Sequence, residues 1–142
     1  MYERLLVAVD HSHVSEHVLK AATELALLAS AEVWVLHLRE REAMAKAPGA
    51  PALVAAETTD KAEAEVQAAV GKLAGAGVKA HGEVRNTIFG HAAREIIADA
   101  EAHDVGLIIM GSKGRGDLAG LVLGSTTHKV IHLTERPVLV VR

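Results

Sequence analysis

The sequence contains no cysteine among its 142 residues, and only 2% of the residues are aromatic. Without cysteine the chain forms no disulfide, no thiolate metal site and no cysteine nucleophile. With so few aromatic side chains, the core must consist of Val, Leu, Ile and Ala. This aliphatic bias is typical of a buried parallel sheet flanked by alanine-rich helices. The length fits one domain, residues 1–142.

Strong charge and long apolar runs are also missing. The formal net charge is −3, so the composition gives no sign of nucleic-acid binding or of attraction to an anionic membrane. No apolar run approaches the roughly 20 residues of a membrane span. The opening MYERLLVAVD is a poor signal peptide, because its apolar run is short and is preceded by residues of both charges. We therefore expect a soluble cytoplasmic protein.

Hydrophobic periodicity predicts strands and helices in alternation. Strands are expected at residues 4–9, 32–38, 78–84, 105–110 and 136–141. Apolar residues spaced by three and four predict helices over residues 14–29, 62–73 and 89–100, and another that includes residues 130–133. Residues 39–59 carry charges, two prolines and a glycine without a sustained period, which predicts a flexible loop. The alternation indicates a doubly wound, Rossmann-like α/β fold, with a five-stranded parallel sheet and helices on both faces.

Glycines are concentrated in the segment MGSKGRGDLAGLVLGSTTHK, residues 110–129, directly after a predicted buried strand. The phosphate-loop, dinucleotide and nucleophile-elbow patterns are all absent from it. Glycines allow backbone N–H groups to converge on phosphate oxygens, Lys113 and Arg115 add positive charge, and Ser125 and Thr126 offer hydroxyl donors. Ligands of doubly wound sheets bind beyond the carboxyl ends of the strands. The segment thus predicts an anion cradle, although a long glycine loop also serves simply to route the chain.

The spacing of Gly111, Gly114, Gly124 and Ser125 satisfies G-2x-G-9x-G[S/T], and here the sequence resembles the ATP-binding branch of the universal stress proteins. LLVAVDHS resembles the first strand of that family, VWVLHL its second, VGLIIMGSKG its fourth and RPVLVVR its common ending. The resemblance therefore covers the whole chain. It implies the same doubly wound fold, related to adenine nucleotide alpha hydrolases, and a bound adenine nucleotide.

The resemblance also implies roles for individual positions. Ribose and phosphates would be bound through Gly111, Ser112, Gly114, Gly124, Ser125 and Thr126. Residues 8–10, namely Ala8, Val9 and Asp10, would line the nucleotide, and Leu38 would meet adenine through its main chain. Met110 either packs in the core or also walls the adenine pocket. Lys113 and Arg115 face either the phosphates or solvent. Some members of the family have Pro and Thr where this chain has Ala8 and Val9, and many have Gly where it has His11.

Asp10 fits two roles. It caps the first helix, or it lies in the nucleotide site and holds a divalent cation, Mg²⁺ or Mn²⁺, between the phosphates; we favour the site. A second metal hypothesis comes from two histidine pairs at i, i+4, namely His13 with His17 and His128 with His132. Two histidines without a nearby third ligand make a poor zinc site, so ordinary surface histidines are the favoured interpretation.

Three functions are compatible with these features. The first is a regulatory or stress-response module that binds ATP, ADP or AMP, and the second is a slow ATPase or phosphotransferase at the same site. The third is a nucleotide-free structural dimer, against which the intact motif argues. Phosphoryl transfer needs a positioned nucleophile, and the sequence singles out no base to orient water, so we expect little catalysis. The resemblance implies a homodimer through residues 136–141, which would also cover an apolar edge strand.

Overall fold

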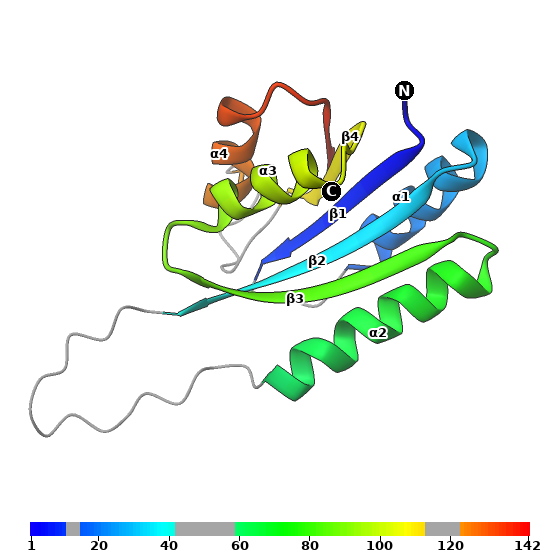
Figure 1. Ribbon diagram of the computed structural model, residues 1–142, viewed down its shortest axis with the longest axis horizontal. Helices are drawn as coiled ribbons and strands as arrows, with labels where there is room; N and C mark the ends of the chain where they lie inside the picture. Colours follow the sequence, from blue (N-terminus) through cyan, green and yellow to red (C-terminus); the bar gives the residue numbers. More distant parts are fainter. Residues whose placement is uncertain (11–14, 42–58, 113–122) are drawn as a thin grey trace, which may run out of the picture.

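Five parallel strands form one sheet in the order β3-β2-β1-β4-β5 (Figure 1). The structure is a computed structural model, and it describes residues 1–10, 15–41, 59–112 and 123–142. In chain order the elements are β1 (Arg4–Asp10), α1 (Glu16–Ala29), β2 (Glu32–Arg41), α2 (Thr59–Gly75), β3 (Ala80–Ile88), α3 (Ala92–Ala102), β4 (Leu107–Gly111), α4 (Ser125–Leu133) and β5 (Val138–Val141). The expected doubly wound α/β fold is confirmed.

The helices cover both faces of the sheet, as Figure 1 shows, with α1 and α2 on one side and α3 and α4 on the other. Strand β1 is buried on both faces because its successive side chains point in opposite directions. Leu5 and Val7 pack against α1 and α2, whereas Leu6 and Ala8 pack in the core under α3 and α4. No described helix is long and apolar enough to cross a membrane.

Helix α1 begins with a serine cap. The Ser15 hydroxyl accepts a hydrogen bond of 3.1 Å from the Val18 N–H, which satisfies one of the free amides of the first turn. The helix ends at Ser30, whose backbone is left-handed with φ 52°.

Strand β2 is longer than expected and shortens the predicted loop. Residues 39–41 belong to β2 and Thr59 begins α2, so only residues 42–58 of the expected loop 39–59 remain, and these lie outside the described residues. Strand β3 likewise runs from residue 80 to residue 88 rather than from 78 to 84. The two extensions pair with each other up to Arg41 and Ile88. Ladder hydrogen bonds between the strands thus extend both beyond their apolar cores.

Helix α3 begins later than its apolar pattern predicts. Phe89 is 68% exposed in a turn, and Gly90 beside it has φ +83°, a backbone conformation that favours glycine. The helix starts at Ala92, so the inclusion of Phe89 in the helical face was wrong. Ile131 and Leu133 of α4 are also exposed, and Val130 is the apolar side chain of that turn that enters the core.

Candidate functional site

The candidate site lies at the carboxyl ends of β1 and β4, in the middle of the sheet. From β1 the chain proceeds to β2 and β3 on one side, and it then returns to β4 and β5 on the other side. The winding direction therefore reverses between β1 and β4, and in folds of this kind ligands bind beyond these strand ends, at a position that we call the β1–β4 crevice. Ala8 pairs with Met110, and Asp10 pairs with Leu38, so these predicted site residues lie side by side.

The predicted residues at the strand ends are mostly core residues. Ala8, Leu38 and Met110 are 4% exposed or less and pack under α3 and α4, while Val9 packs on the opposite face. Their side chains fill the interior of the protein. For Met110 this agrees with one of its two expected roles, namely packing in the core. The structure assigns Asp10 to the last position of β1 in its backbone pairing.

The two ends of the glycine segment are joined by hydrogen bonds. The Gly124 N–H donates to the Ser112 carbonyl oxygen at 2.9 Å, and the Ser112 N–H donates to the Val141 carbonyl oxygen at 2.8 Å. The Thr127 hydroxyl donates to the Gly111 carbonyl oxygen at 3.0 Å. These bonds fix the start of α4 against the end of β4. Lys113, Gly114 and Arg115 lie outside the described residues.

The first turn of α4 supplies the polar groups of the site. Gly124 is the N-cap residue and carries no side chain to bond the free amides of that turn. Such amides and the helix dipole together favour an anion. Ser125 is exposed, whereas Thr126 is only 8% exposed. The Ser125 side chain is therefore accessible from solvent, whereas the Thr126 side chain is turned into the protein.

Sequence reasoning missed Thr127. It is 5% exposed, and its hydroxyl links the first turn of α4 to the last residue of β4. The available signal was a second threonine directly after the motif, at a first-turn position from which its hydroxyl can reach the preceding strand. Thr127 thus has a positioning role for the loop ends.

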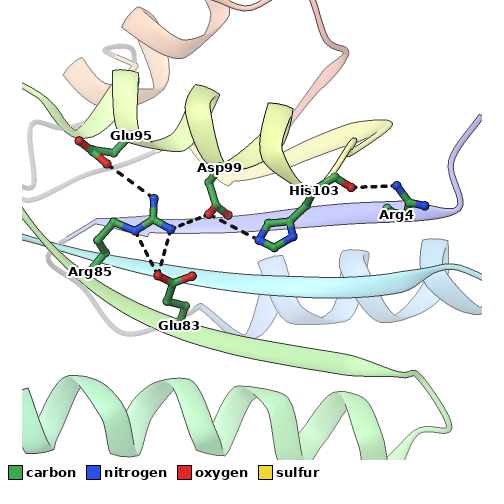
Figure 2. Close-up of polar contacts among 6 residues, drawn as sticks. All are labelled: Arg4, Glu83, Arg85, Glu95, Asp99 and His103. Atoms are coloured by element: carbon green, nitrogen blue, oxygen red, sulfur yellow. Dashed lines mark hydrogen bonds and ion pairs between the residues drawn. The ribbon is translucent and has the colours of Figure 1, made fainter.

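A cluster of possible metal ligands lies elsewhere, between β3 and α3. Within the part of the chain that the structure describes, Glu83, Asp99 and His103 are the one group of three whose ligand atoms lie within 4.8 Å of one another. Figure 2 shows Arg85 between their carboxylates, with its Nη2 atom 2.9 Å from Glu83 Oε1 and 2.8 Å from Asp99 Oδ1. Because a guanidinium already neutralises these oxygens, the cluster is an ion-pair network and does not fit a cation.

The charge on Arg85 is stabilised in this network. Burial lowers the pKa of its guanidinium, but the hydrogen bond to Glu83 and the charges of Glu83 and Asp99 outweigh that effect and raise the pKa above its ordinary value. Glu95 adds a third carboxylate, with its Oε2 atom 3.6 Å from Arg85 Nη1. The arrangement holds α3 to the edge of the sheet.

Comparison with known proteins places the chain in a family. The model of the Universal stress protein family matches residues 1–142. The universal stress protein YxiE of Bacillus subtilis is 35% identical, and the match covers 100% of both chains. Among solved structures, protein MJ0577 of Methanocaldococcus jannaschii superposes with a TM-score of 0.77 at 26% identity, over 99% of this chain and 96% of the other.

A further solved structure carries a ligand. The universal stress protein from Archaeoglobus fulgidus in complex with dAMP has a TM-score of 0.70 at 22% identity, with 99% of this chain and 98% of the other covered. This likeness concerns the fold.

Proposed function

The chain belongs to the universal stress protein family, and from that premise we propose that it binds an adenine nucleotide and acts as a nucleotide-dependent stress-response module. The observation that carries the proposal is the closed connection between Ser112 and Gly124, which sets the first turn of α4 beside the β1–β4 crevice. The motif G-2x-G-9x-G[S/T] spans this connection from Gly111 to Ser125. The complex of the Archaeoglobus fulgidus relative with dAMP supports the same class of ligand.

In this proposal each group binds the part of the nucleotide that suits its chemistry. Phosphate oxygens accept from the first-turn amides of α4 and from the Ser125 hydroxyl, with Gly111 and Gly114 as further backbone N–H donors. Ser112 and Gly124 instead hold the two ends of the segment in place, because their N–H groups donate to the carbonyl oxygens of Val141 and Ser112. Lys113, Arg115 and Thr126 remain further candidates for the phosphates. The backbones of Ala8, Val9, Leu38 and Met110 meet the adenosine portion, since their side chains are buried.

Mg²⁺ or Mn²⁺ would be held by Asp10 together with phosphate oxygens, as is usual for hard cations that keep most of their water ligands. The residues fit this arrangement, because the position of Asp10 at the end of β1 is adjacent to the β4 edge of the crevice. The cation would neutralise phosphate charge when the nucleotide is bound.

We propose binding with little turnover. In the described part of the crevice, the groups gathered besides Asp10 are backbone amides, hydroxyls and buried aliphatic side chains. The amides and hydroxyls bind phosphate but do not activate water as a base does, and in this proposal Asp10 is used to hold the cation. A slow ATPase would show steady phosphate release under excess ATP, which distinguishes it from the binding module.

A homodimer through β5 is a further part of the proposal. β5 lies at the edge of the sheet, and all four of its residues are partly exposed. Beside it lies an apolar hollow of about 490 Å³, lined in part by Tyr2, Leu28 and Leu139. An apolar edge strand next to an apolar hollow is typical of a surface that a second copy covers.

The test measures both nucleotide content and stabilisation. The purified protein is denatured and the released nucleotide is identified by ion-exchange chromatography; the nucleotide-free protein is then melted with ATP, ADP or AMP, with and without Mg²⁺. We expect stabilisation of the wild type and its loss in Gly124→Val, which places a branched side chain at the α4 cap. Gly71→Ala, on an exposed position of α2, serves as the control. If the wild type neither carries nucleotide nor gains stability, the proposal fails.

A further inference from the structure

His128 and His132 of α4 face each other across one helical turn. Their Nε2 atoms are 3.2 Å apart, the ring centroids are 4.4 Å apart, and both residues are exposed. In the metal-free protein this contact is a hydrogen bond in which one ring donates Nε2–H to the unprotonated Nε2 atom of the other. The contact therefore holds two imidazole nitrogens close together beside the helix.

The distance between the two nitrogens matches a chelate. With a metal–nitrogen distance of about 2.05 Å, the observed 3.2 Å corresponds to an angle of about 103° at the metal. This value lies between the square-planar and tetrahedral angles. A cation can therefore bind both Nε2 atoms without a change in the helix. The ring that donates Nε2–H would shift to the Nδ1–H tautomer, so that both lone pairs face the metal.

We propose that His128 and His132 form a binding site for one divalent transition-metal cation of the class that prefers imidazole, such as Cu²⁺, Ni²⁺ or Zn²⁺. The site is separate from the proposed Asp10 cation, since Mg²⁺ prefers oxygen ligands. The proposal does not depend on nucleotide binding.

The surroundings of the pair leave room for further ligands. A cavity of about 460 Å³ lies between the start of α3 and α4, and His91, Arg94 and Lys129 line it together with the pair. His91 does not join the pair in a group whose ligand atoms all lie within 4.8 Å, among the residues described. Within the described residues the site therefore has two protein ligands, with open positions for water or an anion. The positive charges of Arg94 and Lys129 favour an anionic co-ligand over a second cation.

A metal bridge between positions i and i+4 would also tie two turns of α4 together. The His128 N–H already donates to the Gly124 carbonyl oxygen at 2.9 Å, so the pair begins one turn after the cap. Since a ligand that binds only the folded state stabilises it, the melting temperature should rise with metal concentration. We expect a rise of at least about 4 °C near saturation for a chain of this size.

The experiment uses tag-free protein stripped of metal with EDTA and then exchanged into metal-free buffer. Titration calorimetry with Cu²⁺, Ni²⁺, Zn²⁺ and Mg²⁺ should show one transition-metal ion per chain at the pair, tightest for Cu²⁺, and no Mg²⁺. His128→Gln and His132→Gln should each weaken the binding at least tenfold. Both residues are exposed, so the variants should keep the fold, which circular dichroism checks.

Two controls separate this site from other histidines. His17→Gln removes a histidine of α1, whose ring nitrogen contacts the Arg142 carbonyl oxygen, and it should leave the affinity unchanged. In long-range ¹H–¹⁵N spectra, Zn²⁺ should shift the Nε2 signals of His128 and His132 while Nδ1 stays protonated. Binding that persists in the His128→Gln/His132→Gln variant, or that is lost in His17→Gln, would overturn the proposal, as would the absence of binding to the wild type.

Discussion

Arg85 of β3 and Asp99 of α3 are joined by a 2.8 Å contact between Nη2 and Oδ1, and Asp99 is only 3% exposed (Figure 2). The nearly buried carboxylate depends on this partner, because a charge removed from water needs compensation. His103 Nε2 is farther away, at 3.7 Å. The contact fixes α3 to the sheet. The cluster of Glu83, Asp99 and His103 therefore stabilises the fold through ion pairs, although its residue types could also bind a metal.

Removal of Arg85 should therefore destabilise the fold strongly. Arg85→Met leaves the Asp99 carboxylate nearly buried without its partner, and we expect a loss of about 3 kcal/mol in the free energy of unfolding. Urea denaturation measures it. Arg85→Met combined with Asp99→Leu should recover much of the loss. If Arg85→Met costs less than the double variant, the ion pair is not the cause.

The stability should also depend on the ionisation of Glu32. Its pKa lies below the ordinary value because of the hydrogen bond from Lys79, 3.0 Å away, and that from His81. A pKa that is lowered in the folded state stabilises the protein at every pH above the ordinary glutamate pKa of about 4.3. This contribution disappears as the pH falls through the folded-state pKa. The melting temperature of the wild type should be higher than that of Glu32→Gln at neutral pH, and the two melting temperatures should be equal in strong acid.

The control for this measurement is Glu24→Gln, since Glu24 is 63% exposed and pairs only loosely with Lys20 at 4.0 Å. Such a surface pair should change the pH profile little. A difference between wild type and Glu32→Gln that persists unchanged into strong acid would contradict the assignment.

Substitution by alanine at two glycines should change the free energy of unfolding in opposite directions. A Cβ at Gly82 of β3 would overlap the Val66 side chain of α2 and lie 2.9 Å from Val70 Cγ2, whereas a Cβ at Gly71 of α2 meets nothing within 4 Å. We expect Gly82→Ala to cost about 1–3 kcal/mol and Gly71→Ala to add about 0.5–1 kcal/mol through better helix propensity. Chemical denaturation of both variants tests the close packing of α2 on β3; equal effects would refute it.

Thr127 should affect both stability and ligand binding. Thr127→Val keeps the shape but removes the hydroxyl that donates to the Gly111 carbonyl oxygen, which should cost about 1 kcal/mol. If the bond positions the loop ends for a nucleotide, ATP affinity should fall as well. Thr127→Ser, which retains the hydroxyl, should restore the affinity. A valine variant that binds ATP as the wild type does would limit Thr127 to a role in stability.

The proposed dimer depends on the open side of β5. The Pro137 carbonyl oxygen accepts from Ile108 of β4 and the Val141 carbonyl oxygen from Ser112 directly after β4, so the backbone groups of Val138 and Val140 point away from β4. Val140→Pro removes an N–H on that open side and leaves the β4 ladder intact. Light scattering after gel filtration should show a monomer, whereas Val140→Thr stays dimeric. A Val140→Pro dimer would exclude pairing through β5.

Much of the fold followed from local pattern. The run at Leu5–Leu6–Val7 is apolar at every position because β1 is covered on both faces, and such a run predicts a parallel strand without knowledge of its neighbours. The predicted ends of β2 and β3 were wrong, because the pairing of these strands decides where they end. β2 and β3 continue to Arg41 and Ile88 because each supplies hydrogen bonds to the other, which neither segment reveals alone.

The same contrast between local pattern and contact between distant residues applies to the candidate site. Gly111, Gly124 and Ser125 could be proposed from their spacing, since glycines and a hydroxyl residue between strand and helix are a local signal. Thr127 was missed because its role depends on the approach of the Gly111 carbonyl oxygen, a contact across 16 positions. Its importance appears when α4 lies against β4.

The sequence by itself determined the aliphatic core, the alternation of elements and the motif that places this chain in its family, because each is written in residue type and spacing. The tertiary structure alone decided the strand order, the partnership of Arg85 with Asp99 and the contact of the Thr127 hydroxyl with the Gly111 carbonyl oxygen. These depend on where separate elements pack and on which rotamers the packing leaves, and such distances follow from the balance of many contacts rather than from any one segment.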